Sequence, residues 1–291
     1  MNGILLVDKP AGWTSMDVCA KLRGIFHERR IGHSGTLDPM ATGLLVVFLG
    51  RATRAMSFAE GDEKTYEAAL RLGLVTDTQD ISGRVLSQTE ARVTEDALEA
   101  ALTRFCGRQM QLPPMYSAIK VQGQKLYDLA RKGREVERQP REITVYALER
   151  RGFADNGDVL FTVRCSKGTY VRTLCHDLGA ALGCGGAMSA LRRTQAGRFT
   201  LSGAHTLEQI QAAADRGEAE TLLLPVDALF GEHPALTLTG PQEKTVRNGG
   251  AYSLPDAPAG RYRLYSRAGS FLALGEVRDG VMRTVKSFFE V

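Results

Sequence analysis

The sequence predicts an α+β fold, with a mixed, mainly antiparallel central sheet flanked by helices and loops and a small β-rich C-terminal domain. Strand-like and helix-like segments interleave without the regular alternation that builds a parallel sheet. The length of 291 residues suggests about two domains, at roughly 150 residues per domain. After Pro225 short β-rich runs separated by Gly/Pro turns replace the mixed pattern. We therefore predict a larger domain over 1–228 and a smaller one over 229–291.

The first fifty residues predict a strand, a helix and a second strand. The apolar run 4–7 is typical of a short strand that ends in a turn sequence. Apolar residues at helical spacing follow Thr14 and Ser15, either of which can cap a helix. A loop with three glycines and a proline is predicted over 32–43, and the apolar residues 44–49 predict a fully buried strand.

The rest of the larger domain continues the mixed pattern. Alternating polar and apolar residues over 64–73 predict a half-buried strand. Two further strands are predicted over 143–148 and 159–165. Helices are predicted from Thr94 to Phe105, over 171–182 with Gly183 closing the last turn, and over 206–216. In the C-terminal part, strands are predicted over 261–266, 271–277 and 284–289.

Composition excludes several classes of protein. A chain that is 43% hydrophobic and 24% charged is not disordered throughout. The longest apolar run, 44–49, is far shorter than the roughly 20 residues that span a membrane, and no basic region precedes the first apolar run. The five cysteines form no CxxC pair, which favours reduced thiols in the cytoplasm. A metal site is disfavoured, because Cys175, His176 and Cys184 would need a distant fourth ligand.

The net charge of +4 is unevenly distributed along the chain. Residues 1–100 carry a net charge of −3, residues 101–200 carry +9, and residues 201–291 carry −2. A basic middle third is typical of a surface that binds a polyanion such as nucleic acid. On charge alone, a solvated charged face is an equally good interpretation.

The glycine-rich loop 32–43 contains a candidate catalytic carboxylate, Asp38. Asp38 precedes a proline, which biases it toward an extended conformation, and a buried strand follows directly. Constrained loops at strand ends often present catalytic groups. Without further information, a simple turn-capping role for Asp38 is the better interpretation. The glycine spacing matches neither GxxxxGK[ST] nor GxGxxG, so it does not indicate a nucleotide-phosphate site.

Six motifs favour a catalytic role for Asp38 over turn capping. In order and content they resemble those of the pseudouridine synthases, in the tRNA pseudouridine synthase B branch. The motifs are DKPAGWTS (8–15), GHSGTLDPMATGLL (32–45), KTY (64–66), PPMYSAIK (113–120), KGTYVR (167–172) and LRRTQAGRF (191–199). The resemblance covers nearly the whole chain. It implies the pseudouridine synthase fold, with a C-terminal RNA-binding domain of the PUA kind.

The resemblance also implies a reaction and its residues. Uridine in RNA becomes pseudouridine when the N1–C1′ bond is replaced by a C5–C1′ bond, and no cofactor or metal is required. Asp38 matches the nucleophile. Three routes are open for it: attack on C1′, attack on C6 and assistance to a glycal route. Tyr66 matches a tyrosine that stacks on the base, although its strand pattern alone favours a core role. Tyr170 and Arg172 match the active-site tyrosine and arginine, and Leu191 matches a leucine that packs on the base. Arg172 is expected to pair with Asp38 and favour its ionised form.

The implied substrate is uridine 55 in the T arm of tRNA, flipped out of its stack. His33 matches a histidine that enters the emptied loop, and Lys9 is expected to support either the active-site loop or a phosphate.

Residues 120–141, called the basic element below, are expected to be mobile, to form a short helix ending at Gly133 and to contact phosphates. Its candidate contacts are Lys120, Lys125, Arg131, Lys132 and Arg134. In the C-terminal domain, the candidates for contacting the acceptor stem are Arg247, Arg261, Arg263 and Arg267.

Two other functions remain open at this stage. One is membership of the guide-RNA-dependent branch, in which a similar domain works inside a ribonucleoprotein. The other is a tRNA-binding or tRNA-folding protein in which catalysis is secondary. We expect a cytoplasmic monomer that binds tRNA, needs no obligatory protein partner and does not associate with membranes.

Overall fold

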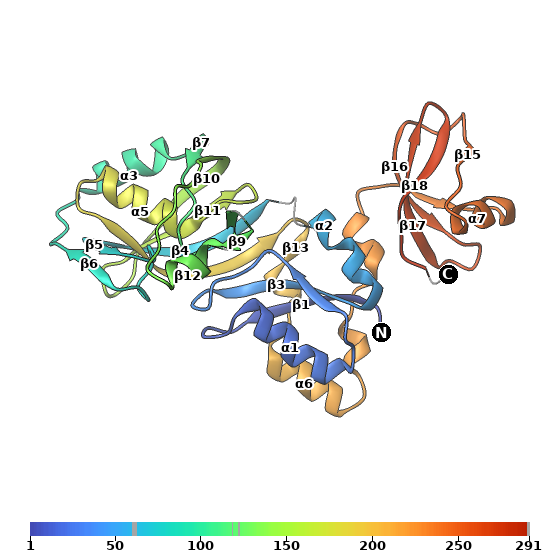
Figure 1. Cartoon of the computed structure of the whole chain (residues 1–291), viewed down its shortest axis with the longest axis horizontal. Helices are drawn as coiled ribbons and strands as arrows, with labels where there is room; N and C mark the ends of the chain where they lie inside the picture. Colours follow the sequence, from blue (N-terminus) through green and yellow to red (C-terminus); the bar gives the residue numbers. More distant parts are fainter. Residues whose placement is uncertain (60–62, 118, 122, 290–291) are drawn as a thin grey trace.

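The computed structural model describes residues 1–59, 63–117, 119–121 and 123–289, without the side chains of Lys120 and Lys125 (Figure 1). Its large sheet has the strand order β1-β3-β12-β4-β11-β10-β7, with β2 beside β3 and β13 beside β12. These strands are β1 (Gly3–Lys9), β2 (Ile31–Ser34), β3 (Thr42–Leu49), β4 (Lys64–Leu72), β7 (Gly107–Gln111), β10 (Arg141–Phe153), β11 (Val159–Cys165), β12 (Gly186–Ala196) and β13 (Phe199–Thr200).

The large sheet consists of two halves that meet at β3 and β12. All its pairings in the described residues are antiparallel except this one, which is parallel over two residue pairs, Arg192 with Thr42 and Arg193 with Gly43. Gly43 has φ +95°, and a Cβ there would lie 2.4 Å from the Arg193 carbonyl oxygen, so the close approach requires glycine. The predicted mixed, mainly antiparallel sheet is confirmed.

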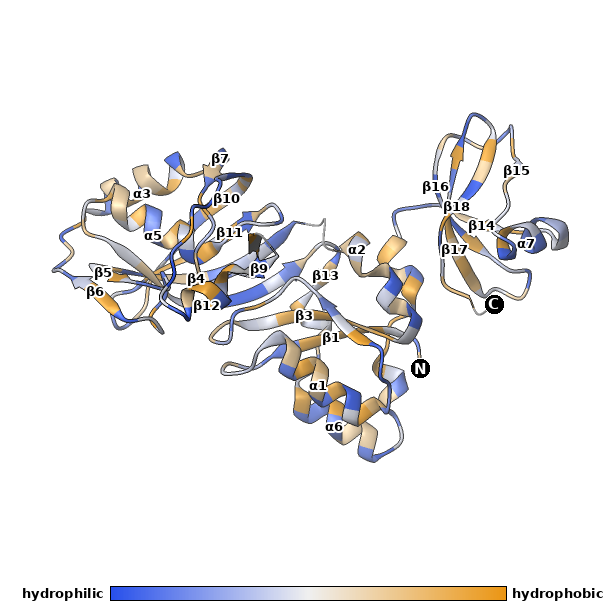
Figure 2. Cartoon of the chain, viewed as in Figure 1, coloured by the Kyte–Doolittle hydropathy of each residue, from blue (hydrophilic) through white to orange (hydrophobic). Residues whose placement is uncertain are grey.

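Apolar residues bury both faces of the β1–β3 half, as the continuous run 44–49 predicts. Helices α1 (Ser15–Phe26) and α6 (Leu207–Asp215) pack on one face. A Thr14 capping box starts α1 and a Thr206 capping box starts α6. The other face packs against η1 (Gly50–Ala55), α2 (Met56–Ala59) and η4 (Val226–Phe230). Figure 2 shows the hydrophobic residues along β1 and β3.

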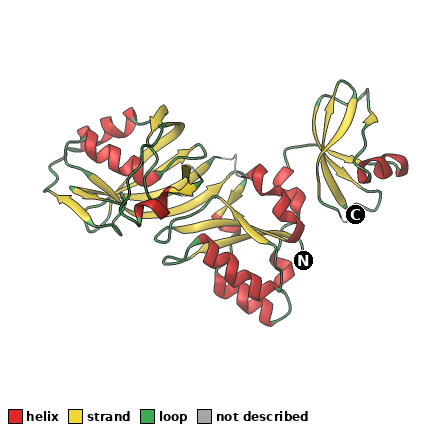
Figure 3. Cartoon of the chain, in the orientation of Figure 1, coloured by secondary structure: helices red, strands yellow, loops and turns green. Residues whose placement is uncertain are grey.

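The second half of the sheet, β4 and β10–β12, is covered by α3 (Glu95–Arg104) and α5 (Val171–Ala181), which lie on the same side of it (Figure 3). Two small hairpins flank this half. They are β5 (Leu74–Thr76) with β6 (Val85–Gln88), and β8 (Lys120–Val121) with β9 (Gln124–Lys125), the latter followed by α4 (Leu126–Ala130). Single turns η2 (Leu201–Gly203) and η3 (Ala219–Leu222) complete the larger part of the chain.

The C-terminal part forms its own five-stranded sheet, with the order β14-β16-β17-β18-β15 and a separate core. Its elements are β14 (Ala235–Thr237), α7 (Gly240–Arg247), β15 (Tyr252–Ser253), β16 (Gly260–Tyr265), β17 (Phe271–Arg278) and β18 (Val281–Ser287). Phe230 joins the two parts, because its ring centroid lies 5.3 Å from that of Phe58 and 5.8 Å from that of Phe288. The boundary between 228 and 229 stays a prediction.

Several elements differ from the sequence prediction, and four of them illustrate the differences. The loop predicted over 32–43 begins with β2, because pairing with β3 draws residues 31–34 into the sheet. The last strand, predicted at 284–289, is β18 at 281–287. Helix α7 and the central strand β12 are additional elements. No helix within the described ranges is long and apolar enough to span a membrane.

Candidate active site

Asp38 lies in the loop between β2 and β3, and hydrogen bonds hold this loop on both sides of it. The Leu37 N–H donates to Ser15 Oγ at 2.9 Å, and Ser15 Oγ donates to the Leu37 carbonyl at 3.2 Å. On the other side, the Gly12 N–H donates to the Pro39 carbonyl at 2.8 Å. The turn after β1 and the start of α1 therefore fix the position of the carboxylate.

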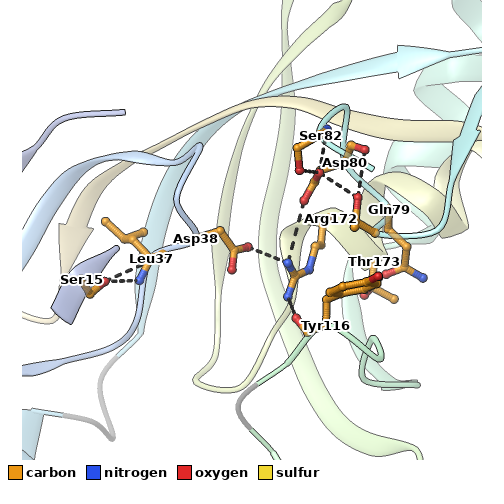
Figure 4. A network of polar contacts seen from close by, with 10 residues as sticks. Ser15, Leu37, Asp38, Gln79, Asp80, Ser82, Tyr116, Arg172 and Thr173 are labelled. Carbon is orange, nitrogen blue, oxygen red and sulfur yellow. Dashed lines mark hydrogen bonds and ion pairs between the residues drawn. The ribbon is translucent and has the colours of Figure 1, made fainter. Parts of the chain in front are cut away.

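The Asp38 carboxylate pairs with Arg172, which lies in the first turn of α5 (Figure 4). Arg172 Nη1 lies 3.0 Å from Asp38 Oδ2 and 3.9 Å from Asp80 Oδ2, and Arg172 Nη2 donates to the Tyr116 carbonyl. The Arg172 side chain is 6% exposed, whereas the Asp38 side chain is 30% exposed. The cation is therefore enclosed by protein, while the carboxylate remains accessible to a substrate.

Two opposing effects act on the protonation of Asp38. Burial raises its pKa above the ordinary aspartate value, and the neighbouring Arg172 opposes this rise. The like charge of Asp80 adds to the rise, and Lys9 opposes it. The expected pairing of Arg172 with Asp38 is present and favours the ionised form, but the loss of hydration has the larger effect on the pKa. Asp38 is thus a more basic carboxylate than a freely hydrated aspartate.

Asp80, a residue that the sequence analysis missed, completes this network. Its Oδ1 accepts from Thr78 Oγ1 at 2.9 Å, from the Ser82 N–H at 2.9 Å and from Ser82 Oγ. Its Oδ2 faces Arg172, and the residue is 3% exposed. A buried aspartate is usually paired with another group. The sequence signal that could have indicated Asp80 was the turn-forming run 77–83, which contains it. Its partner is 92 positions away in the sequence, and no local pattern indicates it.

The other predicted catalytic residues lie near this network. Tyr170 is the N-cap residue of α5, and the Arg172 guanidinium carbon lies 5.6 Å from the centroid of its ring. Burial raises the pKa of Tyr170, so its phenol stays protonated near neutral pH. Tyr66 on β4 and Leu191 on β12 are buried in one apolar cluster with Leu37, the neighbour of Asp38. This placement allows either a core role or a base-contacting role for Tyr66.

Arg193, to which the sequence analysis assigned no role, lies behind the Asp38 loop. It is 1% exposed, and its Nε donates to the Leu44 carbonyl at 2.7 Å while its Nη2 donates to the Gly35 carbonyl at 2.9 Å. Arg193 therefore connects β12 to the start of the loop at Gly35 and to strand β3. Burial, with the charge of Arg193 as a smaller contribution, lowers the pKa of His33 on β2. His33 is accordingly neutral at physiological pH.

Lys9 is fully buried at the end of β1. Its Nζ donates to the carbonyls of Trp13 at 2.6 Å, Pro10 at 2.8 Å and Pro39 at 3.3 Å. Burial lowers the pKa of Lys9 to about 8, and the charge of Asp38 acts against this shift. Of the two roles expected for Lys9, these contacts describe support of the active-site loop.

The basic element differs from the buried network in the exposure of its cations. Arg131, Lys132 and Arg134 are exposed, and Arg131 lies over the Tyr127 ring at 5.5 Å from its centroid. The side chains of Lys120 and Lys125 fall outside the description. Helix α4 ends at Ala130, three residues before the predicted Gly133. A cavity of about 520 Å³ is formed mostly by residues of the element itself and is lined by Pro113, Ile119, Val121, Leu126, Val136, Glu137, Arg138, Gln139 and Arg141.

The four C-terminal arginines divide into two pairs. Arg247 forms an ion pair with Glu243 at 2.8 Å, and Arg263 Nε donates to the His233 carbonyl at 2.9 Å. Arg261 and Arg267 are exposed, and so is the ion-paired Arg247. Among the described residues, no group of three or more His, Cys, Asp or Glu side chains is arranged to hold a metal ion.

Comparison with known proteins agrees with this geometry. Residues 23–171 match the model of the TruB family pseudouridylate synthase N-terminal domain, and residues 172–231 match the tRNA pseudouridylate synthase B C-terminal domain. The tRNA pseudouridine synthase B of Dechloromonas aromatica is 43% identical over 96% of this chain and 93% of the relative. That of Ralstonia nicotianae is 44% identical over 97% of this chain and 93% of the relative.

Solved structures show the same fold. This chain superposes on a chain of a Cbf5–Nop10–Gar1 complex with a TM-score of 0.75 and 25% identity, covering 99% of this chain and 85% of that one. A chain of an H/ACA ribonucleoprotein bound to a substrate RNA gives a TM-score of 0.74 at 24% identity, covering 99% and 85%. The protein belongs to the TruB family of pseudouridine synthases.

Proposed function

We propose that this enzyme isomerises uridine 55 in the T arm of tRNA to pseudouridine, with Asp38 as the nucleophile. The observation that supports the proposal most is the partly exposed Asp38 carboxylate 3.0 Å from the buried Arg172. The curated relatives are named for tRNA, which supports the substrate class. Binding through the T arm and function as a monomer are parts of the same proposal.

Asp38 acts while the N1–C1′ bond breaks and the C5–C1′ bond forms, by attack on C1′, by attack on C6 or through a glycal route. The C5 proton is lost and N1 gains one, so the reaction consumes no other reactant. Arg172 orients the carboxylate, and its burial keeps this orientation independent of solvent. Tyr66 and Leu191 contact the base, and Tyr170 is the candidate for relaying the C5 proton.

The target base reaches Asp38 only after leaving its stack, which costs a few kcal/mol and is easiest in a structured loop. His33, being neutral, enters the space left in the RNA without bringing an unpaired charge there. The basic element contacts the phosphates of the T arm, and exposed Arg261 and Arg267 of the PUA-like C-terminal domain extend this surface toward the acceptor stem.

The guide-RNA-dependent branch is the second candidate, since a solved relative of the same fold comes from a ribonucleoprotein. The two candidates differ in one requirement. The proposed enzyme acts on a bare tRNA transcript without guide RNA or protein partner, whereas a guide-dependent enzyme does not.

Tritium release from tRNA carrying 5-tritiated uridine tests the proposal. The purified protein should release tritium, and Asp38→Asn should release none while it binds tRNA as tightly as the wild type. Because a nucleophile is essential, we expect a fall of at least ~10³-fold. Substantial turnover by the variant would remove Asp38 from its role. Failure of the wild type on bare tRNA would overturn the function itself.

A further inference from the structure

Helix α5 places Tyr170 and Arg172 in the site, and two glutamine side chains from different elements hydrogen-bond to its first turn. Gln111 ends β7 and contacts Tyr170, and Gln79 lies between β5 and β6 and contacts Thr173. We propose that Gln111 and Gln79 are positioning residues, which act through the first turn of α5 to align Tyr170 and Arg172 with Asp38.

Gln111 makes two hydrogen bonds to the backbone of Tyr170. The Tyr170 N–H donates to Gln111 Oε1 at 2.8 Å, and Gln111 Nε2 donates to the Tyr170 carbonyl at 3.1 Å. No side chain caps α5 at Tyr170, and the Gln111 amide from a distant strand instead bonds the backbone of the N-cap residue itself. Gln111 is 4% exposed, so water does not compete for these bonds. These two hydrogen bonds fix the peptide groups on both sides of Tyr170.

Gln79 holds the other end of the turn. Thr173 Oγ1, on a residue 2% exposed, donates to Gln79 Oε1 at 2.7 Å. The Gln79 carbonyl accepts from the Met188 N–H of β12 at 3.0 Å, which anchors the residue to the central sheet. Thr173 follows Arg172 and Gln79 precedes Asp80, so this bond runs beside the Arg172–Asp80 contact (Figure 4).

The backbone of Gln79 supports this interpretation. Its φ of +67° is in the left-handed region, which a non-glycine residue adopts at a cost in conformational energy. Such strain is retained where the surrounding structure demands the conformation, and it gathers at functional sites. Here the left-handed turn brings the Gln79 side chain to Thr173 and the Asp80 carboxylate to Arg172.

Rate and affinity measurements on full-length variants test the inference, which rests on the proposed function. Gln111→Met removes both hydrogen bonds to Tyr170. Thr173→Val removes the hydroxyl at nearly constant volume, and Thr173→Ser restores it. Gln109→Met is the matched control, because Gln109 lies on the same strand and its Nε2 donates to the carbonyl of Phe105 instead of the site.

We expect kcat at saturating tRNA to fall at least ~10-fold in Gln111→Met and in Thr173→Val, because sub-ångström misplacement of reacting groups is costly. The Kd for tRNA should stay within about twofold, since neither side chain is expected to touch RNA. Thr173→Ser should recover most of the wild-type kcat, and Gln109→Met should retain it.

A purely structural role predicts a different result. The melting temperature would fall, while kcat per folded molecule, measured well below that temperature, would match the wild type. That result, or a loss of tRNA affinity at unchanged kcat, overturns the inference. If Gln111→Met does not fold, the comparison of Thr173→Val with Thr173→Ser decides. Inactivity of the wild type on tRNA would instead count against the proposed function.

Discussion

The Asp38–Arg172–Asp80 network and the basic element differ in the exposure and in the pairing of their charged side chains. In the network, Arg172 is 6% exposed and lies within 4 Å of two carboxylates. In the basic element, Lys132 and Arg134 are exposed, and no ion pair joins them to a carboxylate within the described residues. Buried, paired charges respond to pH through their pKa values, and exposed, unpaired cations respond to salt. The comparison suggests that chemistry and RNA binding can be perturbed separately.

Among the variants that separate the two regions, Arg172→Lys is expected to have the largest effect, and it disturbs the network alone. The shorter side chain loses its simultaneous contacts with Asp38, Asp80 and the Tyr116 carbonyl, and kcat should fall ~10²-fold. Since burial raises the pKa of Asp38 and Arg172 opposes the rise, the weaker pair should move the acid limb of the kcat–pH profile to higher pH.

The control for this variant is Arg164→Lys. Arg164 forms an exposed pair with Glu63 at 3.2 Å on the same sheet, outside the network. The Arg164→Lys variant should change neither kcat nor the kcat–pH profile. An acid limb that moves to lower pH in Arg172→Lys would contradict the electrostatic assignment.

A smaller and different effect is expected when the basic element is neutralised. Lys132→Gln with Arg134→Gln should lower the slope of log Kd against log salt by about 1.5, if each cation contacts one phosphate. At saturating tRNA, kcat should not change. Arg92→Gln with Arg216→Gln removes the same charge from exposed positions elsewhere and should leave the slope unaltered. An equal slope in both double variants would exclude the phosphate contacts.

The smallest expected effect concerns stability, at Lys9. Its folded-state pKa of about 8 lies below the unfolded value of 10.5, so the unfolded chain binds more protons between these values. The free energy of unfolding of the wild type, relative to Lys9→Met, should therefore increase by about 1–3 kcal/mol from pH 8 to pH 10. Urea unfolding at several pH values measures this difference. A decrease over the same range would refute the burial of a charged amine.

The elements predicted from the sequence are those with a strong local pattern. The apolar run of β3 and the capped stripe of α1 are examples. Strand β12 escaped prediction because register shifts between Met188 and Ala190 and between Arg193 and Gln195 break its alternation. The buried Arg193 within it also resembles a surface residue in a sequence pattern.

The residues of the site also divide into those that the sequence predicts and those that it does not. Motifs identified Asp38, Tyr170 and Arg172, each of which lies in a recognisable segment. Gln79, Asp80 and Gln111 escaped notice because their partners lie on α5, between 59 and 94 positions away. Side-chain hydrogen bonds over such separations depend on the folded sheet, and no local period reports them.

Mapping of pseudouridine at single-nucleotide resolution tests the central claim most directly. The purified chain alone would be incubated with an unmodified tRNA transcript, with Asp38→Asn treated in parallel. Our account predicts pseudouridine at position 55 with the wild type and at no position with the variant. Modification at another position, a requirement for guide RNA, or pseudouridine formed by Asp38→Asn would contradict it.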